Sequence, residues 1–188
     1  PSDSFFSALV ATLAGILSEA ELNQFLEPFL GDNPRPPFVT SSLFPRIGPI
    51  CLFPKLAQVQ SEKATPAGYK QLKNVQYLSL ALFQQQLAGK SLDEIFENAK
   101  SLQGGKVLIH PQEWEGLSRS LQGTTSIWQV NQRPRVTLDR MNNQPGIFQT
   151  GEVTYAKGCG LWFGLYWDNA AAQLQNQVKL AFQELAVT

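Results

Sequence analysis

Three arginines cluster in the stretch RPRVTLDRMNNQPGIF, and their chemistry suits an anionic polymer. Arg133, Arg135 and Arg140 lie on and beside a predicted β-hairpin, whose turn is indicated by the Asn-, Pro- and Gly-containing run at 142–146. A guanidinium group binds phosphate oxygens and stacks on nucleobases. In a regular strand, Arg135 points to one face and Arg140 to the other. The stretch therefore predicts either a nucleic-acid contact or a solvated hairpin with scattered arginines.

A second candidate anion site lies at the start of the chain, where Ser2, Asp3 and Ser4 stand before a long apolar helix pattern over 2–17. Ser and Asp are favoured N-cap residues because their side-chain oxygens accept hydrogen bonds from the unpaired N–H groups of the first turn. The same N–H groups can hold a phosphate, although the carboxylate of Asp3 opposes it. Both interpretations stay open from these residues alone.

The residues that catalysis needs are sparse in this chain. The single histidine, His110, follows a predicted strand and precedes Pro111, with no carboxylate at a spacing that indicates a general acid–base pair. The sequence contains no GxGxxG or GxxxxGK[ST] run, and its possible metal ligands lack the spacing of a zinc site. We therefore expect a protein that is not an enzyme and that binds no cofactor or metal.

Charge is unevenly distributed along the 188 residues, although the formal net charge is zero. Residues 1–32 include five acidic side chains and no Lys or Arg, whereas 106–157 includes six basic side chains against four acidic ones. Any anion-binding face should therefore lie in the later part of the chain. Two distant cysteines, Cys51 and Cys159, indicate structural thiols in a reducing compartment. No apolar run approaches a membrane span, so we expect a cytoplasmic protein.

The elements that must position these residues are of mixed α and β type. After the helix over 2–17, Ser18 and Glu21 have the spacing of a capping box, which predicts a second helix. The next expected elements are, in chain order, an extended Pro-rich connection (35–49), a strand (50–53), a polar loop (57–68), a strand (73–79), helices (80–88 and 91–100) and a strand (106–109).

The last third of the chain is rich in predicted β structure. Gly151 inside one strand indicates a β-bulge, and the aromatic side chains that follow it are expected to fill a core. The expected elements are strands over 127–130, 135–140, 147–157 and 160–166, and a helix over 170–185. We predict a single α+β domain over 1–188 with residues 55–125 as a helical insertion. The terminal strands of a βαββαβ, ferredoxin-like arrangement are expected to be missing.

Several stretches resemble the CRISPR RAMP proteins. PSDSFFSAL is similar to a helix start in that group, and LEPFL, PPFVTSSLFPRIGPICLFPK and KNVQYLSLALFQQQLAG are similar to the segments that follow. The most specific match is RVTLDRMNNQPGIFQTGEVTYAKGCGLWFGLYWD, which resembles an Arg-Val-x-x-Asp-Arg hairpin followed by a Gly-Leu-aromatic-Phe strand. Taken in order, the stretches cover nearly the whole chain and resemble the Csm-four family of type III-A CRISPR effector subunits, in the Cas-five-like RAMP group.

The resemblance implies a non-catalytic subunit of an RNA-guided effector complex that binds the 5′ repeat-derived tag of crRNA and caps the backbone filament. It implies three partners, namely the crRNA, the large Cas-ten subunit and the adjacent backbone RAMP subunit. It also implies a ferredoxin-like (RRM-like) RAMP fold with a β-hairpin thumb. The implied RNA-binding residues are Ser2, Ser4, Arg46, Arg133, Arg135, Arg140 and Lys157, of which Arg135 and Arg140 match most specifically.

Two parts of the family pattern are missing from this sequence. They are the strand before the Ser-Asp motif and the Gly-rich, Arg-containing loop after the last helix, which contributes to RNA binding. We therefore expect a partial chain whose RNA site is completed outside it. Two other functions stay open: a metal-independent crRNA-processing endoribonuclease of the RAMP group, with His110 as general acid or base, and a purely protein-binding adaptor.

Overall fold

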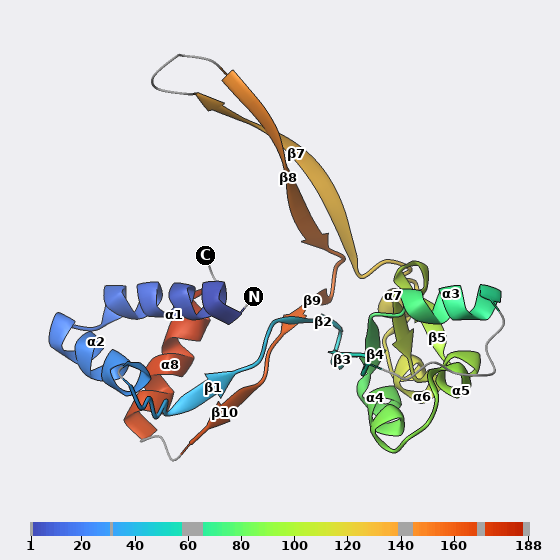
Figure 1. Cartoon of the computed structure of the whole chain (residues 1–188), viewed down its shortest axis with the longest axis horizontal. Coiled ribbons are helices and arrows are strands. Elements are labelled where there is room, and N and C mark those ends of the chain that lie inside the picture. Colours follow the sequence, from blue (N-terminus) through green and yellow to red (C-terminus); the bar gives the residue numbers. More distant parts are fainter. Residues whose placement is uncertain (1, 31, 58–65, 139–144, 169–171, 186–188) are drawn as a thin grey trace. The chain divides into compact units, whose positions relative to one another are not determined.

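The computed structural model describes the chain apart from residues 1, 31, 58–65, 139–144, 169–171 and 186–188 (Figure 1). Arg140 and the first part of the predicted hairpin turn therefore lie outside the described residues. The contacts within the chain divide it into two compact units, which we call unit 1 (Pro1–Leu43 with Phe163–Thr188) and unit 2 (Phe44–Trp162). The predicted α+β class is confirmed, while the single domain with an insertion over 55–125 stays a prediction.

Unit 1 packs helices on one face of a two-stranded antiparallel sheet. The apolar residues of its first helix recur at helical spacing, so Leu9 and Leu13 are fully buried. The rings of Phe38 and Trp167, which pair across the sheet, have centroids 5.2 Å apart. The elements of unit 1 are α1 (Ser2–Ile16), α2 (Glu19–Leu26), a 3-10 turn (Glu27–Phe29), β1 (Phe38–Thr40), β10 (Leu165–Trp167) and α8 (Ala172–Leu185).

The predicted capping box is confirmed at the start of α2. The Ser18 hydroxyl accepts from the Glu21 N–H, and a Glu21 carboxylate oxygen accepts from the Ser18 N–H at 2.9 Å. The Ser18 hydroxyl also donates to that oxygen at 2.7 Å. These hydrogen bonds favour the ionised carboxylate, so the pKa of Glu21 lies below its usual value of 4.5.

Unit 2 is built on a six-stranded sheet with the order β5-β6-β4-β3-β2-β9. All neighbouring strands are antiparallel except β4 and β6, which are parallel. The strands are β2 (Phe44–Ile47), β3 (Ile50–Pro54), β4 (Tyr77–Ser79), β5 (Lys100–Leu102), β6 (Val107–Ile109) and β9 (Cys159–Trp162). The helices are α3 (Pro66–Asn74), α4 (Leu80–Leu87), α5 (Leu92–Glu97), α6 (Pro111–Glu115) and α7 (Arg119–Gln122), and a 3-10 turn (Gln103–Gly105) joins β5 to β6.

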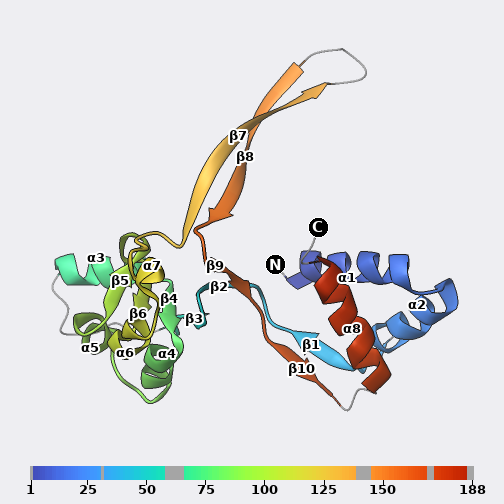
Figure 2. The ribbon, with the colours of Figure 1, turned by 180° about the vertical axis from the view of Figure 1, so that it is seen from behind.

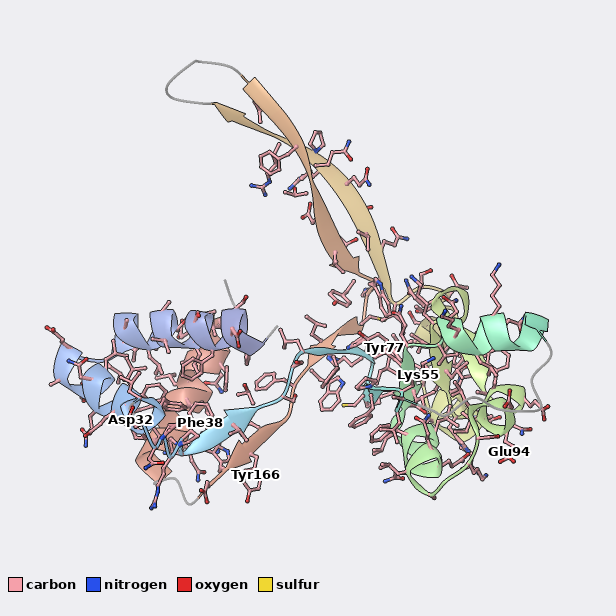
Figure 3. All side chains as sticks on the ribbon, in the orientation of Figure 1. Asp32, Phe38, Lys55, Tyr77, Glu94 and Tyr166 are labelled. Atoms are coloured by element: carbon pink, nitrogen blue, oxygen red, sulfur yellow. The ribbon has the colours of Figure 1, made fainter. Side chains whose placement is uncertain are left out.

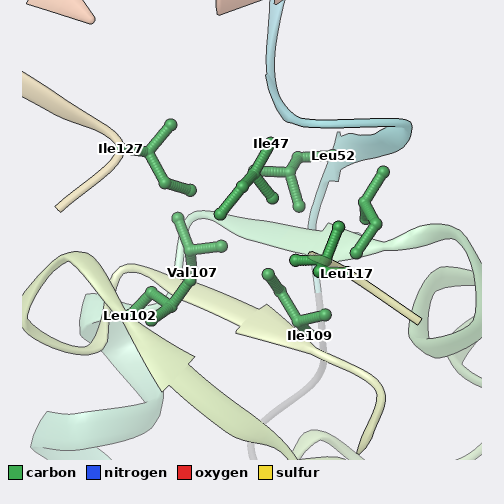
Figure 4. Packing of buried hydrophobic residues seen from close by; sticks show 8 residues of the cluster. Ile47, Leu52, Leu102, Val107, Ile109, Leu117 and Ile127 are labelled. Carbon is green, nitrogen blue, oxygen red and sulfur yellow. The ribbon is translucent and has the colours of Figure 1, made fainter. Parts of the chain in front are cut away.

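Two hydrophobic cores lie on the two faces of this sheet. Strand alternation directs Val107 and Ile109 into the first core, which Figure 4 shows with Leu117 and Ile127 packed around them. The intervening Leu108 belongs to the second core, together with residues of α3, α4 and α5. A strand that is buried on both faces reads as a continuous apolar run, as the sequence of β6 does.

A long antiparallel hairpin, formed by β7 (Trp128–Leu138) and β8 (Pro145–Tyr155), completes unit 2 (Figures 1 and 2). The register runs without interruption from Trp128 opposite Tyr155 to Leu138 opposite Pro145. The predicted bulge at Gly151 is therefore wrong. Gly151 pairs directly with Gln132, and the ladder needs no extra residue there.

Other sequence-based expectations failed at element boundaries. The strand predicted over 73–79 begins only at Tyr77, because α3 continues to Asn74. The strand predicted over 160–166 is two strands, β9 and β10, which pair with β2 and β1 respectively. The predicted helix over 91–100 stops at Glu97. The Pro-rich connection contains β1 and β2, and its Pro45 pairs with Leu161.

The chain leaves the hairpin through Gly158, where the backbone and its packing both require glycine. Gly158 has a φ of +78°, and its carbonyl oxygen accepts from the Gly48 N–H at 2.8 Å. A Cβ at this position would lie 2.7 Å from Cδ2 of Leu121 on α7. The exit from the hairpin is therefore tied to the turn between β2 and β3.

We expect Gly158→Ala to lower the free energy of unfolding by about 2–4 kcal/mol, because left-handed strain and overpacking against Leu121 add together. Gly89→Ala is the matched control, since Gly89 has a φ of +93° but no atom within 4 Å of a Cβ built there. In the control, the free energy of unfolding should fall only by the cost of the left-handed backbone, about 1–2 kcal/mol. Urea denaturation measures both losses, and equal losses in the two variants would contradict the packing account.

Candidate nucleic-acid interface

One face of the hairpin carries its arginines. Alternation along the paired strands places Arg133 and Arg135 on the same face, opposite Thr150 and Phe148 of β8. Glu152 lies on this face too, because it is two residues from Thr150. We call this surface of five residues the arginine face. It combines cationic groups with an exposed aromatic ring, since Phe148 is 43% exposed.

The two arginines of this face differ in their electrostatic surroundings. Nη1 of Arg133 lies 3.3 Å from Oε2 of Glu152, and both side chains are largely in solvent. An exposed ion pair of this kind contributes about 0–1 kcal/mol to stability. Among the described residues no acidic side chain forms a salt bridge with Arg135, whose strand partner is Phe148. Arg135 is therefore the guanidinium of this face that is most available to an anionic ligand.

The opposite face of the hairpin carries three exposed valines, with Gln132 and Gln149 between them. Val130 and Val153 lie directly opposite each other and are 63% and 48% exposed, and Val136 is 61% exposed. We call these three residues the valine face. Exposed valines of this kind offer apolar area to a partner that covers this face. A hairpin of two strands is also marginally stable alone, so covering this face would stabilise it.

The base of the hairpin is anchored in unit 2. The buried Ile127 precedes β7 and accepts at its carbonyl oxygen from the Ala156 N–H at 3.0 Å. Tyr77 of β4, labelled in Figure 3, meets the ring of Trp128 edge to face, with centroids 6.0 Å apart. Burial raises the pKa of Tyr155, the strand partner of Trp128, and the nearby Tyr77 adds to that shift. The arginine face thus extends from an aromatic, partly buried base.

The two units carry opposite formal charge. Unit 1 contains seven acidic side chains and two basic ones, a charge of −5, whereas unit 2 contains eight acidic and thirteen basic ones, a charge of +5. The net charge of zero for the whole chain hides this separation. The hairpin belongs to the basic unit. This agrees with the prediction that any anion-binding face lies in the later part of the chain.

Arg46 lies on β2 within the sheet rather than on the hairpin. Its Nη1 donates to the Gly48 carbonyl oxygen at 2.9 Å, and its guanidinium lies against Gly160, the opposite residue on β9. Burial raises the pKa of the nearby Cys159 thiol, and the charge of Arg46 opposes part of that shift. Part of the hydrogen-bonding capacity of Arg46 is therefore used within its own turn, and its role in binding RNA stays a prediction.

The remaining predicted site residues are spread over the chain. Lys157 is exposed in the turn between β8 and β9. Ser2 and Ser4 belong to unit 1, where they form the first turn of α1 rather than preceding it as a cap, and Ser4 is exposed. Arg140 lies outside the described residues. The structure therefore brings Arg133 and Arg135 together on one face, and the assignment of all these residues to RNA binding stays a prediction.

His110 is the N-cap residue of α6. Its Nδ1 accepts from the Gln112 N–H at 3.3 Å, and its own N–H donates to the Ser79 hydroxyl at 3.0 Å. With Lys90 and Glu94 it lines a cavity of about 200 Å³. Within the described part of the chain, no group of three or more His, Cys, Asp or Glu side chains could hold a metal ion. Likewise, no helix described here is long and apolar enough to cross a membrane.

Sequence reasoning missed one residue at the hairpin base and three members of the arginine face, namely Phe148, Thr150 and Glu152. Phe148 and Glu152 follow from the register, because counting outward from the turn pairs Phe148 with Arg135. Gln103 contacts the first residues of β7 from a distant turn. In the sequence, Gln103 stands before two glycines. This pattern indicates a turn with an unusual backbone conformation, but it does not reveal which residues the side chain contacts.

No protein-family model matches the chain, and no curated protein matches it in sequence. Solved structures do match its fold. A chain of the crystal structure of the Csm3–Csm4 subcomplex in the type III-A CRISPR-Cas interference complex superposes with a TM-score of 0.69 at 16% identity, covering 98% of this chain and 57% of that one.

Crystal structures of a Csm1–Csm4 cassette match as well. The TM-score is 0.61 for the cassette in complex with cA4, at 18% identity, covering 98% of this chain and 59% of that one. For the cassette in complex with pppApA the TM-score is 0.58 at 18% identity, and the match covers 98% of this chain and 58% of that one. Csm4 is the component common to these structures. The chain therefore has a fold seen in type III-A Csm complexes, and it spans 57–59% of the length of the solved chains it matches.

We expect Glu152→Gln to strengthen binding of the chain to single-stranded poly(U) by about two- to threefold, because Arg133 loses its competing carboxylate. Thermal unfolding should hardly change, since the ion pair is exposed. Glu115→Gln is the matched control, because it removes an exposed carboxylate of unit 2 that lies off the hairpin. Filter binding at fixed salt measures the affinities, and equal gains in both variants would contradict a local effect at the arginine face.

Proposed function

We propose that the chain is a Csm4-type subunit of a type III-A CRISPR effector complex and that it binds the 5′ repeat-derived tag of crRNA. Two independent observations support this proposal. The chain matches the fold of Csm4-containing structures over 98% of its length, and its ordered motifs resemble the same family. The observation that carries the RNA-binding part is the arginine face, on which Arg135 has an exposed aromatic neighbour and no ion pair among the described residues.

The arginine face suits single-stranded RNA in particular. Guanidinium groups bind backbone phosphates, while exposed aromatic rings such as Phe148 stack on unpaired bases. Phosphate contacts supply affinity and position the strand, and stacking tolerates any base. In this proposal Arg133 and Arg135 bind the backbone of the tag and Phe148 stacks on one of its bases. The hairpin then acts as the thumb of a RAMP protein.

Unit 1 supports a ferredoxin-like RAMP core. Its helix α1 leads to β1, and β10 leads to α8, with β1 and β10 paired antiparallel. This order fits the inner αββα part of a βαββαβ arrangement, with unit 2 inserted between the two strands. We propose that the outer strands of that order complete the core, and that the insertion carries the RNA-binding hairpin.

The matching structures suggest protein partners, because Csm4 is paired with Csm3 in one of them and with Csm1 in another. We propose that this chain likewise contacts the adjacent backbone RAMP subunit and the large Cas-ten subunit, and so caps the backbone filament. The valine face offers an apolar surface for such a contact, and the charge of −5 on unit 1 favours a basic neighbour.

The proposal is tested by charge reversal in the reconstituted effector complex, with guides that carry or lack the 5′ tag. Arg135→Glu should reduce the tag-dependent gain in affinity by about tenfold, because one charge-assisted contact is replaced by repulsion. Arg119→Glu, an equal charge change on exposed α7 of the same unit, should leave that gain unchanged. Electrophoretic mobility shifts measure both. An equal tag-dependent gain in affinity in the two variants would overturn RNA binding by the arginine face and favour a purely protein-binding adaptor.

We also propose that the chain does not cleave RNA and that His110 acts as a helix cap. His110→Ala should lower stability by about 1 kcal/mol, through loss of the hydrogen bond to Gln112, and leave crRNA intact. His110→Asn should restore stability, because Asn is among the best N-cap residues. Thermal melts and incubation with labelled precursor RNA give the two readouts. Cleavage by the unaltered chain that both variants abolish would establish the endoribonuclease alternative instead.

A further inference from the structure

A strained turn lies beside the base of the hairpin. Gln103, at the end of β5, has a φ of +55° and is the one non-glycine residue with a positive φ in the described part of the chain. Gly104 and Gly105 follow with φ values of +62° and +86°. A long side chain seldom adopts this backbone conformation, and residues that do so cluster at sites where the surroundings enforce it. The contacts of Gln103 must therefore account for its left-handed conformation.

The side chain of Gln103 makes three hydrogen bonds to backbone groups at the start of the hairpin. Its Oε1 accepts from the Ile127 N–H at 2.7 Å and from the Trp128 N–H at 3.3 Å. Its Nε2 donates to the Trp128 carbonyl oxygen at 2.8 Å. The Gln103 N–H donates in turn to the Thr125 carbonyl oxygen at 3.0 Å. The carboxamide thus binds both backbone groups of the first residue of β7, as a neighbouring strand would.

We propose that Gln103 is a positioning residue that sets the direction in which the hairpin leaves unit 2, and so places the arginine face on the RNA. This inference rests on the proposed function of that face. Arg135 lies seven positions along β7 from Trp128, which is roughly 23 Å in a strand. A change of about 10° at the base therefore moves its guanidinium by about 4 Å, more than the length of a hydrogen bond. A residue that never touches RNA can in this way control the contact.

Two substitutions separate the hydrogen bonds of Gln103 from its backbone strain. Gln103→Gly removes the carboxamide and leaves a residue that adopts a φ of +55° freely, so the relief of strain offsets part of the lost hydrogen bonding. Gln103→Ala removes the carboxamide and keeps the strain. Asn74→Ala is the matched control, because the Asn74 amide donates to the Gly104 carbonyl oxygen in the same turn, at 2.8 Å.

The experiment uses the reconstituted effector complex with a tagged guide. In both Gln103 variants, the Trp128 amide should exchange its hydrogen about tenfold faster, and affinity for the tag should fall about three- to tenfold. The Asn74 variant should show neither change, and the melting temperature of Gln103→Gly should lie above that of Gln103→Ala. The loss caused by Arg135→Glu should shrink in the Gln103→Gly background, because both changes remove the same contact. If Gln103 had only a structural role, the losses of tag affinity caused by Gln103→Gly and Arg135→Glu would add.

Three results would overturn parts of this inference separately. Unchanged exchange at Trp128 would overturn the hydrogen-bonded anchor, whatever the RNA affinity. Faster exchange with unchanged tag affinity, while Arg135→Glu loses affinity, would overturn the positioning role and leave the proposed function standing. Full tag affinity in Arg135→Glu would overturn the proposed function, and the positioning role with it, whereas the exchange measurement would still decide whether Gln103 holds the hairpin.

Discussion

A hairpin of two strands has no second layer of its own to pack against, and this constraint governs the rest of the structure. Along their 11 paired residues, β7 and β8 hold each other by their hydrogen-bond ladder. Their direction is set at the base, where Ile127 is buried, Tyr77 meets Trp128 and the Gln103 carboxamide binds the backbone of Trp128. The base is packed into the first core of unit 2, to which Ile127 belongs and against which Trp128 lies.

Because both faces of the hairpin stay exposed, they can differ in chemistry. The arginine face is cationic with one aromatic ring, and the valine face is apolar. The two units also differ, since the formal charge is +5 for unit 2 and −5 for unit 1. Such a distribution suits a protein that binds RNA through one element and protein subunits through others. The chain also shares its fold with Csm4-containing structures.

Local signals in the sequence predicted local structure well. The capping box of α2, the helix α1 and the hairpin strands follow from residue types within a few positions of one another. The failures needed distant partners. The short strands β1 and β2 pair with β10 and β9, more than a hundred residues away, which no local pattern reveals. Gln103 was missed for the same reason, because its partners Ile127 and Trp128 are defined by the fold alone.

The central claim is that the cationic surface of the hairpin touches the leading end of the guide RNA. Photo-crosslinking tests it most directly, with a 4-thiouridine placed at each tag position in turn within the assembled complex and mass spectrometry of the linked peptides. Our account predicts crosslinks from tag positions to peptides of β7 and β8, with Phe148 among the linked residues. Crosslinks from every tag position to other subunits or to unit 1, and none to the hairpin, would contradict it.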